Sequence, residues 1–150
     1  MRLNDLREWL ECIVEPITSE AVYFVGNYVE TEENRDKHLI AVKGTGGTTR
    51  APFIRYNRYR VIILSPQKLM QPVDEDGNDI DYSGDGPSLF TSPQKTTWDL
   101  SEEIAEAIEL ATDKSLPDCA SGIRLLGNKS GPLYTTDDRI YFTLDLEIIK

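Results

Sequence analysis

Residues 139–149, RIYFTLDLEII, form the stretch that decides the fold. Apolar and polar side chains alternate along it, and a period of two is typical of a strand with one buried face. The side chains that face one way are Ile140, Phe142, Leu144, Leu146 and Ile148. Those that face the other way are Tyr141, Thr143, Asp145 and Glu147. This strand predicts a sheet with one face that another layer must cover.

Further β-type segments lie upstream of this strand. Three of them are rich in β-branched and aromatic residues: 21–30 (AVYFVGNYVE), 38–43 (HLIAVK) and 54–65 (IRYNRYRVIILS). Within the first, Gly26 is a candidate bulge. GTGGTT at 44–49 is typical of a flexible connection between strands. A short strand at 122–126 and a turn-rich stretch at 128–132 then lead into the closing strand.

Two amphipathic helices are predicted to form the covering layer. In residues 4–14 the apolar side chains follow the 3.6-residue period, with Asn4 as the N-cap and Pro16 as the stop. The second helix opens on a capping box at Asp99–Glu102 and closes before Pro117. Its apolar stripe consists of Leu100, Ile104, Ala107, Ile108 and Ala111. The sequence therefore predicts an α+β fold: a mostly antiparallel sheet of four to six strands with both helices packed on one face.

A long arm is predicted to be inserted in this domain, which spans residues 1–150. Residues 66–98 hold four prolines and three glycines, which exclude a long helix, and a small hairpin is possible at 69–82. The arm also carries large apolar side chains that a linker does not need: Leu69, Met70, Leu89, Phe90 and Trp98. These predict a surface that docks on a neighbouring molecule, unless they fold back on their own domain.

Composition limits the classes of function. The chain has 39% hydrophobic residues and a formal net charge of −10, which suits a folded protein and disfavours a reader of nucleic-acid sequence. No apolar run is long enough to span a membrane, and no apolar signal region opens the chain. The two cysteines, Cys12 and Cys119, are expected to be buried free thiols.

Charge is segregated along the sequence. Arginines gather on one predicted strand and carboxylates on the second helix, which suggests that copies of the chain meet, unless both groups are simply solvated faces. The residues predicted to meet between copies are Arg55, Arg58 and Arg60 on one side and Glu102, Glu106 and Glu109 on the other.

No motif indicates catalysis, a cofactor or a metal. The glycine-rich 44–49 lacks the Gly-Lys-Ser/Thr of a phosphate loop, and a strand rather than a helix follows it. Asp74–Asn78 opens like a calcium loop, but Asp79 stands where that loop needs glycine. His38 is the only histidine and has no partner at a recognisable spacing. A carboxylate pair remains open, but the sequence favours a protein that is not an enzyme.

The chain resembles the tail terminator proteins of long-tailed bacteriophages, also called tail-completion or minor tail proteins. The segments that carry the resemblance are LNDLREWLECIV (3–14), RYRVIILS (58–65), LSEEIAEAIELA (100–111) and GPLYTTDDRIYFTLDLEII (131–149). Together they cover most of the chain outside 66–98. The long arm departs from the more compact members of the family.

The resemblance implies a structural virion protein, assembled in the host cytoplasm and placed at the head-proximal end of the tail. Such proteins form a hexameric ring that caps the tail tube, ends its polymerisation and presents a surface to the head–tail connector. DNA would pass through the ring without specific binding, and an acidic wall suits that passage. The alternatives are another head–tail joining or tail-tube structural protein and, less favoured, a small intracellular enzyme.

Overall fold

The computed structural model describes residues 2–51, 54–67, 93–111, 120–137 and 139–149, with the backbone alone at 47–51, 54–56 and 93–95. The elements are α1 (Leu3–Val14), β1 (Val22–Val25), β2 (Leu39–Ala51), β3 (Ile54–Leu64), α2 (Pro93–Ala111), β4 (Gly122–Leu125), β5 (Ser130–Tyr134) and β6 (Ile140–Ile149). One six-stranded sheet has the order β1-β2-β3-β6-β4, and β5 also pairs with β6. Among the described strand pairs, β1–β2 alone is parallel. The predicted α+β class with a mostly antiparallel sheet is confirmed.

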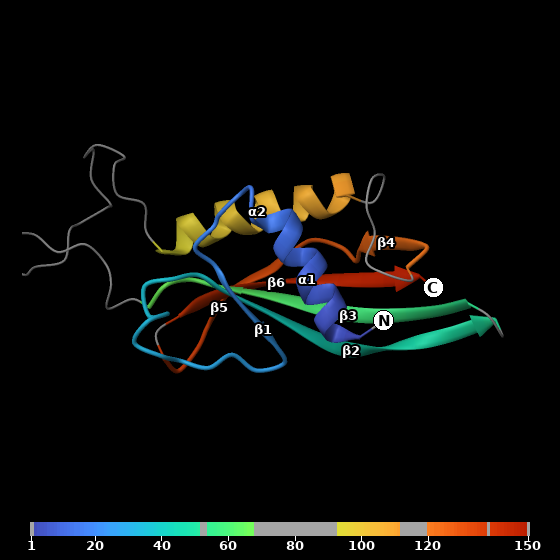
Figure 1. The fold of residues 1–150 in the computed structure, drawn as a ribbon, viewed down its shortest axis with the longest axis horizontal. Helices are drawn as coiled ribbons and strands as arrows, with labels where there is room; N and C mark the ends of the chain where they lie inside the picture. Colours follow the sequence, from blue (N-terminus) through green and yellow to red (C-terminus); the bar gives the residue numbers. More distant parts are fainter. Residues whose placement is uncertain (1, 52–53, 68–92, 112–119, 138, 150) are drawn as a thin grey trace, which may run out of the picture.

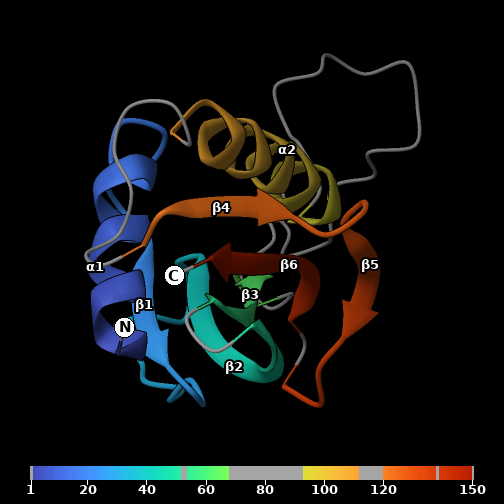
Figure 2. The same ribbon diagram turned by 90° about the vertical axis from the view of Figure 1, so that its right-hand side faces the viewer.

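Both helices lie on one side of the curved sheet, as Figures 1 and 2 show. Their buried side chains form one cluster with alternate residues of the strands, because the pleat sends every second side chain to the same face. From α1 and α2 the cluster takes Leu6, Trp9, Leu10, Val14, Leu100, Ile104 and Ile108. From the strands it takes Ile40, Val42, Tyr59, Val61, Ile63, Ile123, Leu144, Leu146 and Ile148. The alternation predicted for 139–149 thus selects the core face.

The opposite face of the sheet, called here the far face, is only partly solvated. Thr143 and Glu147, which the alternation assigns to this face, are 7% and 3% exposed. Leu39 and Leu64, which pair with each other across β2 and β3, are also buried. The far face therefore holds polar side chains whose hydrogen bonds must be met inside the protein.

The glycine-rich stretch 44–49 is part of β2, so the prediction of a flexible connection is wrong. β2 continues through it, paired with β3, with a one-residue irregularity between Gly44 and Gly46. Gly46 has φ of +113°, a conformation that residues with a Cβ rarely adopt. The glycines thus permit a β-bulge within a long hairpin and do not end the strand.

The second helix begins at Pro93, six residues before the predicted capping box at Asp99–Glu102, so both that box and the arm boundary at residue 98 are wrong. Proline is favoured at the first position of a helix, where its missing N–H would have no partner in the helix anyway. Ser101, inside the helix, donates its hydroxyl to the carbonyl of Trp98 (2.7 Å) and caps nothing. The possible hairpin at 69–82 lies outside the described residues.

Smaller differences occur at the ends of elements. Asn4 lies inside α1 and donates to Glu8 (2.9 Å), while the N-cap is Arg2, whose N–H donates to Asp5 (3.0 Å). Gly26 has φ of +81° and follows the last residue of β1, so it ends the strand and makes no bulge in it. The stretch predicted as turn-rich includes the first residues of β5.

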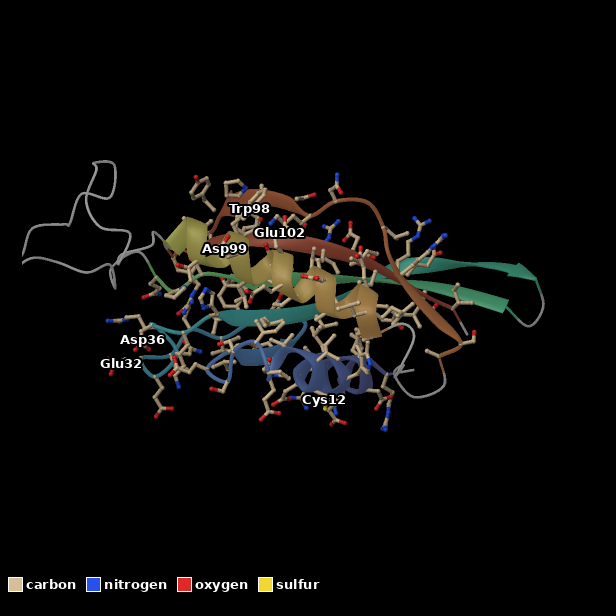
Figure 3. The ribbon with its side chains drawn as sticks, turned by 90° about the horizontal axis from the view of Figure 1, so that it is seen from above. Cys12, Glu32, Asp36, Trp98, Asp99 and Glu102 are labelled. Atoms are coloured by element: carbon tan, nitrogen blue, oxygen red, sulfur yellow. The ribbon has the colours of Figure 1, made fainter. Side chains whose placement is uncertain are left out.

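Cys12 is a free thiol but is exposed, which contradicts the expected burial, and Cys119 lies outside the described residues. Figure 3 shows Cys12 on the outer side of α1.

Candidate interaction surfaces

A buried carboxylate on the far face joins three strands. Glu147 of β6 is 3% exposed and lies between Arg58 of β3 and Arg124 of β4, its cross-strand partners. Arg58 Nε donates to one carboxylate oxygen (3.3 Å) and Arg124 Nε to the other (2.9 Å). Both arginine side chains remain at least half exposed. Glu147 thus fixes two cations that also face outward.

Burial alone would raise the pKa of Glu147, but hydrogen bonds from Arg124 and then Arg58 outweigh it and hold the pKa below 4.5. A carboxylate with a lowered pKa in the folded state stabilises the protein above its unfolded pKa. That contribution is lost as pH falls through the folded pKa.

We therefore expect Glu147→Gln to unfold at a lower denaturant concentration than the wild type at pH 7, because the two arginines lose their anion. The gap between the two midpoints should narrow as pH falls through the lowered pKa of Glu147 in the folded protein, because Glu147 itself then becomes protonated. Urea titrations at pH 7 and at a series of acidic pH values measure both. Equal midpoints of the two proteins at pH 7 would show that the ion pairs do not stabilise the fold.

A second cross-strand pair lies beside the first. Arg60 of β3 and Asp145 of β6 form a two-pronged contact of 2.8 and 3.2 Å, and Lys43 of β2 is opposite Arg60 on the next strand. Together with the Glu147 group, the strands contribute four described cations to the far face, Lys43, Arg58, Arg60 and Arg124, and two carboxylates. The strand residues of the far face are therefore basic on balance.

The outer side of α2 is acidic. Its exposed carboxylates are Asp99, Glu102, Glu103, Glu106 and Glu109. A hollow of about 690 Å³ lies between this helix and the segment from β4 to β5. All of these carboxylates except Asp99 line it. Because α2 covers the core face, the acidic surface and the basic far face lie on opposite sides of the sheet.

One lysine enters the acidic hollow. Lys129 Nζ lies 2.7 Å from a carboxylate oxygen of Glu102 and 3.3 Å from the centre of the Trp98 ring. The same ring packs edge-on against Phe142, with centroids 5.5 Å apart. Trp98 was predicted to lie on the arm, but Figure 3 shows it with Asp99 and Glu102 on the first turns of α2. It is 44% exposed, so one side of the ring still faces solvent.

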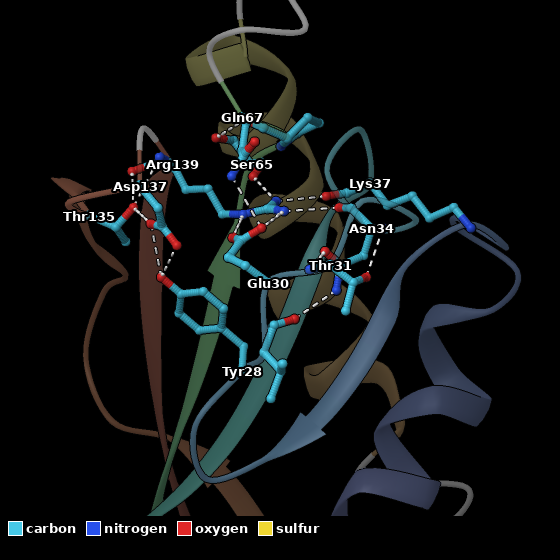
Figure 4. Close-up of polar contacts among 12 residues, drawn as sticks. Tyr28, Glu30, Thr31, Asn34, Lys37, Ser65, Gln67, Thr135, Asp137 and Arg139 are labelled. Atoms are coloured by element: carbon cyan, nitrogen blue, oxygen red, sulfur yellow. Dashed lines mark hydrogen bonds and ion pairs between the residues drawn. The ribbon is translucent and has the colours of Figure 1, made fainter.

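A buried arginine organises the end of the sheet from which the 68–92 segment departs. Arg139, with no exposed surface, forms a two-pronged ion pair with Glu30 and donates to three backbone carbonyls (Figure 4). Those carbonyls belong to Asn34 (2.9 Å), Lys37 (2.9 Å) and Ser65 (2.6 Å). One side chain thus joins the β1–β2 loop, the end of β3 and the start of β6.

Described residues on both sides of 68–92 contact the segment between β1 and β2. On the leading side, Gln67 donates its side-chain amide to Glu30 (3.2 Å) and its backbone N–H to the carbonyl of Arg35 (3.0 Å). On the returning side, the buried Thr97 hydroxyl lies 3.3 Å from Nε2 of His38. Burial, and secondarily the charge of Arg139, lowers the pKa of His38 to about 4. The lone histidine is therefore neutral near pH 7 and has a structural contact.

The predicted interface residues are placed on two separate surfaces. Arg58 and Arg60 lie on the far face, and Glu102, Glu106 and Glu109 on α2, so the structure does not join the two groups within one chain. The backbone of Arg55 is in β3, while its side chain lies outside the described part. The proposed arm residues Leu69, Met70, Leu89 and Phe90 lie outside it as well.

Sequence reasoning missed Arg139, Glu30 and Lys129, whose side-chain partners described above are 27 to 109 residues away along the chain. No local pattern marks such contacts. The one available signal was the position of Arg139 directly before the most regular strand, where a charged side chain enters a buried region.

Within the described residues, no three histidine, cysteine or carboxylate side chains converge as a metal ion would require. No helix in the same ranges is long and apolar enough to cross a membrane. A scan against protein-family models finds no match, and no curated protein matches the chain in sequence.

Proposed function

We propose that this chain is a structural protein of a phage tail, a tail terminator that closes the tail tube as a ring of identical subunits. The observation that carries the proposal is the placement of opposite charge on opposite sides of one sheet: an acidic α2 and a basic far face. Neighbours in a cyclic ring meet through two different surfaces of the same chain. A ring needs such a complementary pair of surfaces. The family resemblance implies a ring of six subunits.

The fold agrees with this reading. Two helices on one face of a mixed sheet match the architecture that the resemblance implies, and the long β2–β3 hairpin reaches past the helices (Figure 1). The proposed partners are the tail-tube protein on one side of the ring and the head–tail connector on the other. DNA passes through the ring without specific binding. The class of a non-enzymatic virion component belongs to this same proposal.

Substitutions on α2, rather than at the arginines, test whether opposite charges hold the copies together. Reversing Arg58 and Arg60 would also strip Glu147 and Asp145 of their partners in the same chain, so a loss of assembly would have two causes. Glu106 is exposed on α2 and lines the acidic hollow. A substitution at Glu106 is therefore expected to change association and not folding.

We expect Glu106→Lys to weaken self-association several-fold at low salt and less at 0.5 M salt, because exposed pairs are each worth roughly 0–1 kcal/mol and are screened. Light scattering over a range of concentrations measures the association. The control is Glu32→Lys, the same charge change at an exposed site on the loop between β1 and β2, apart from α2 (Figure 3), which should leave association unchanged. Equal association of both variants with the wild type at low salt would contradict the charge argument.

The function itself is tested with purified tail tubes. A terminator binds at tube ends and stops further addition of tube subunits, which electron microscopy and the tube-length distribution report. Open-ended polymers formed by this chain alone would favour the alternative of a tail-tube subunit. Binding to heads but not to tubes would favour another head–tail joining protein.

A further inference from the structure

The β2–β3 hairpin leaves one edge of the sheet open. β2 has 13 residues, but β1 pairs only with its first four, Leu39–Val42. Beyond Val42, no described strand lies on the β1 side of β2, whereas its other side stays paired with β3 as far as Ala51. Figure 1 shows the two strands projecting together past β1 and α1.

The register indicates which backbone groups face this open side. The N–H of Gly26 donates to the carbonyl of Val42 (2.8 Å), so the polar groups of Val42 face β1. Alternate residues of a strand direct their N–H and C=O groups to the same side. Because the bulge between Gly44 and Gly46 adds one residue, the groups of Gly47 and Thr49 face the open side, and those of Thr48 face β3.

The open edge lacks two of the usual protections against pairing. Natural edge strands are kept apart by lysine, by proline, by β-bulges or by being short. The six residues from Gly44 to Thr49 contain only glycine and threonine, and the bulge lies at the start of this stretch, between Gly44 and Gly46. Gly44, Thr45 and Gly46 are exposed, so another strand could approach them without displacing a large side chain. Beyond the bulge, an edge of this kind is a template for an added strand.

We propose that a strand of a second copy of this chain adds to the open edge of β2 and so forms the contact between neighbouring subunits. Charge complementarity favours a second copy: the hairpin bears the basic far face, and the same chain supplies an acidic α2 on the opposite side of its sheet. The added strand continues the sheet, and with the helices of the second copy on the far-face side, its acidic α2 lies beside the basic far face of the first copy. The inference rests on the proposed ring for its head-to-tail sense.

The decisive variant is Thr49→Pro. Proline removes one N–H on the open side, while the hydrogen bonds of β2 to β3 use the groups of Thr48. We expect the dissociation constant of the assembly, measured by sedimentation, to rise by about tenfold or more. The matched control is Thr49→Val, which keeps the N–H and the shape of the side chain and should assemble like the wild type.

Amide hydrogen exchange on the wild type tests the same contact without a mutation. The amides of Gly47 and Thr49 should exchange more slowly in the assembled protein than in the dilute monomer. Thr49→Pro that assembles normally, unchanged exchange at both amides on assembly, or a wild type that stays monomeric at every concentration and on tail tubes would overturn the inference. Assembly through this edge without capping of tail tubes would contradict the proposed function alone. Capping of tail tubes while the amides of Gly47 and Thr49 still exchange as fast as in the monomer would contradict this inference alone.

Discussion

Replacing Arg139 with methionine should destabilise the fold by about 3 kcal/mol or more, because removal of one partner of a buried ion pair leaves the other without compensation. Glu30 would lose both of its bonds to the guanidinium, and the carbonyls of Asn34, Lys37 and Ser65 would each lose a donor. The side chain of Glu30 is 27% exposed, so water can solvate part of it and the loss should lie at the lower end of the range for such pairs. Urea unfolding monitored by circular dichroism measures the change.

Two controls separate the network from the loss of any arginine. Arg139→Lys keeps the charge but not the planar fork, so it should recover only part of the stability. Arg35→Met removes an exposed arginine from the same loop and should change stability by less than about 0.5 kcal/mol. If Arg139→Met unfolded at the wild-type urea concentration, the network would be a consequence of the fold and not a cause of its stability.

Stability should fall by about 3 kcal/mol as pH drops from 6.5 to 4, through His38 alone. The folded pKa of His38 is about 4, against 6.5 for a free imidazole, because burial and then the charge of Arg139 oppose the cation. Between these values the unfolded chain binds a proton that the folded chain does not, so acid favours unfolding. Asp99 and Glu103 line the same hollow as His38, but their charges do not restore its usual pKa.

His38→Gln keeps a polar group opposite Thr97 without a titrating proton, and its stability should be nearly flat over the same pH window. Carboxylates with lowered pKa values, such as Glu147, lose their contribution only at lower pH, so the two effects separate. Since His38 is the only histidine, its ring proton resonances in NMR report its pKa directly. A midpoint near 6.5 in the folded protein would contradict the burial argument.

The alternation in residues 139–149 was enough to predict a strand and its core face, and the 3.6-residue period was enough to place both helices. These patterns are local: a strand or helix that packs on one side must repeat its apolar residues with the period of its own backbone. The predictions were wrong where one residue type is compatible with two different local structures. Glycines at 44–49 permit a bulge as readily as a loop, and Pro93 starts a helix as readily as it breaks one.

For the candidate surfaces, too, some features follow from the sequence and others only from the tertiary structure. The sequence alone determined that acidic residues gather on the second helix and arginines on the third strand, since both groups are close along the chain. Only the tertiary structure decided that these groups lie on opposite sides of one sheet and that Arg58 and Arg60 already have partners in Glu147 and Asp145. It alone joined Arg139 to Glu30 across 109 residues and left the edge of β2 open beyond Val42 among the described strands. The physical reason is that burial and pairing depend on contacts between distant segments, which composition and periodicity do not encode.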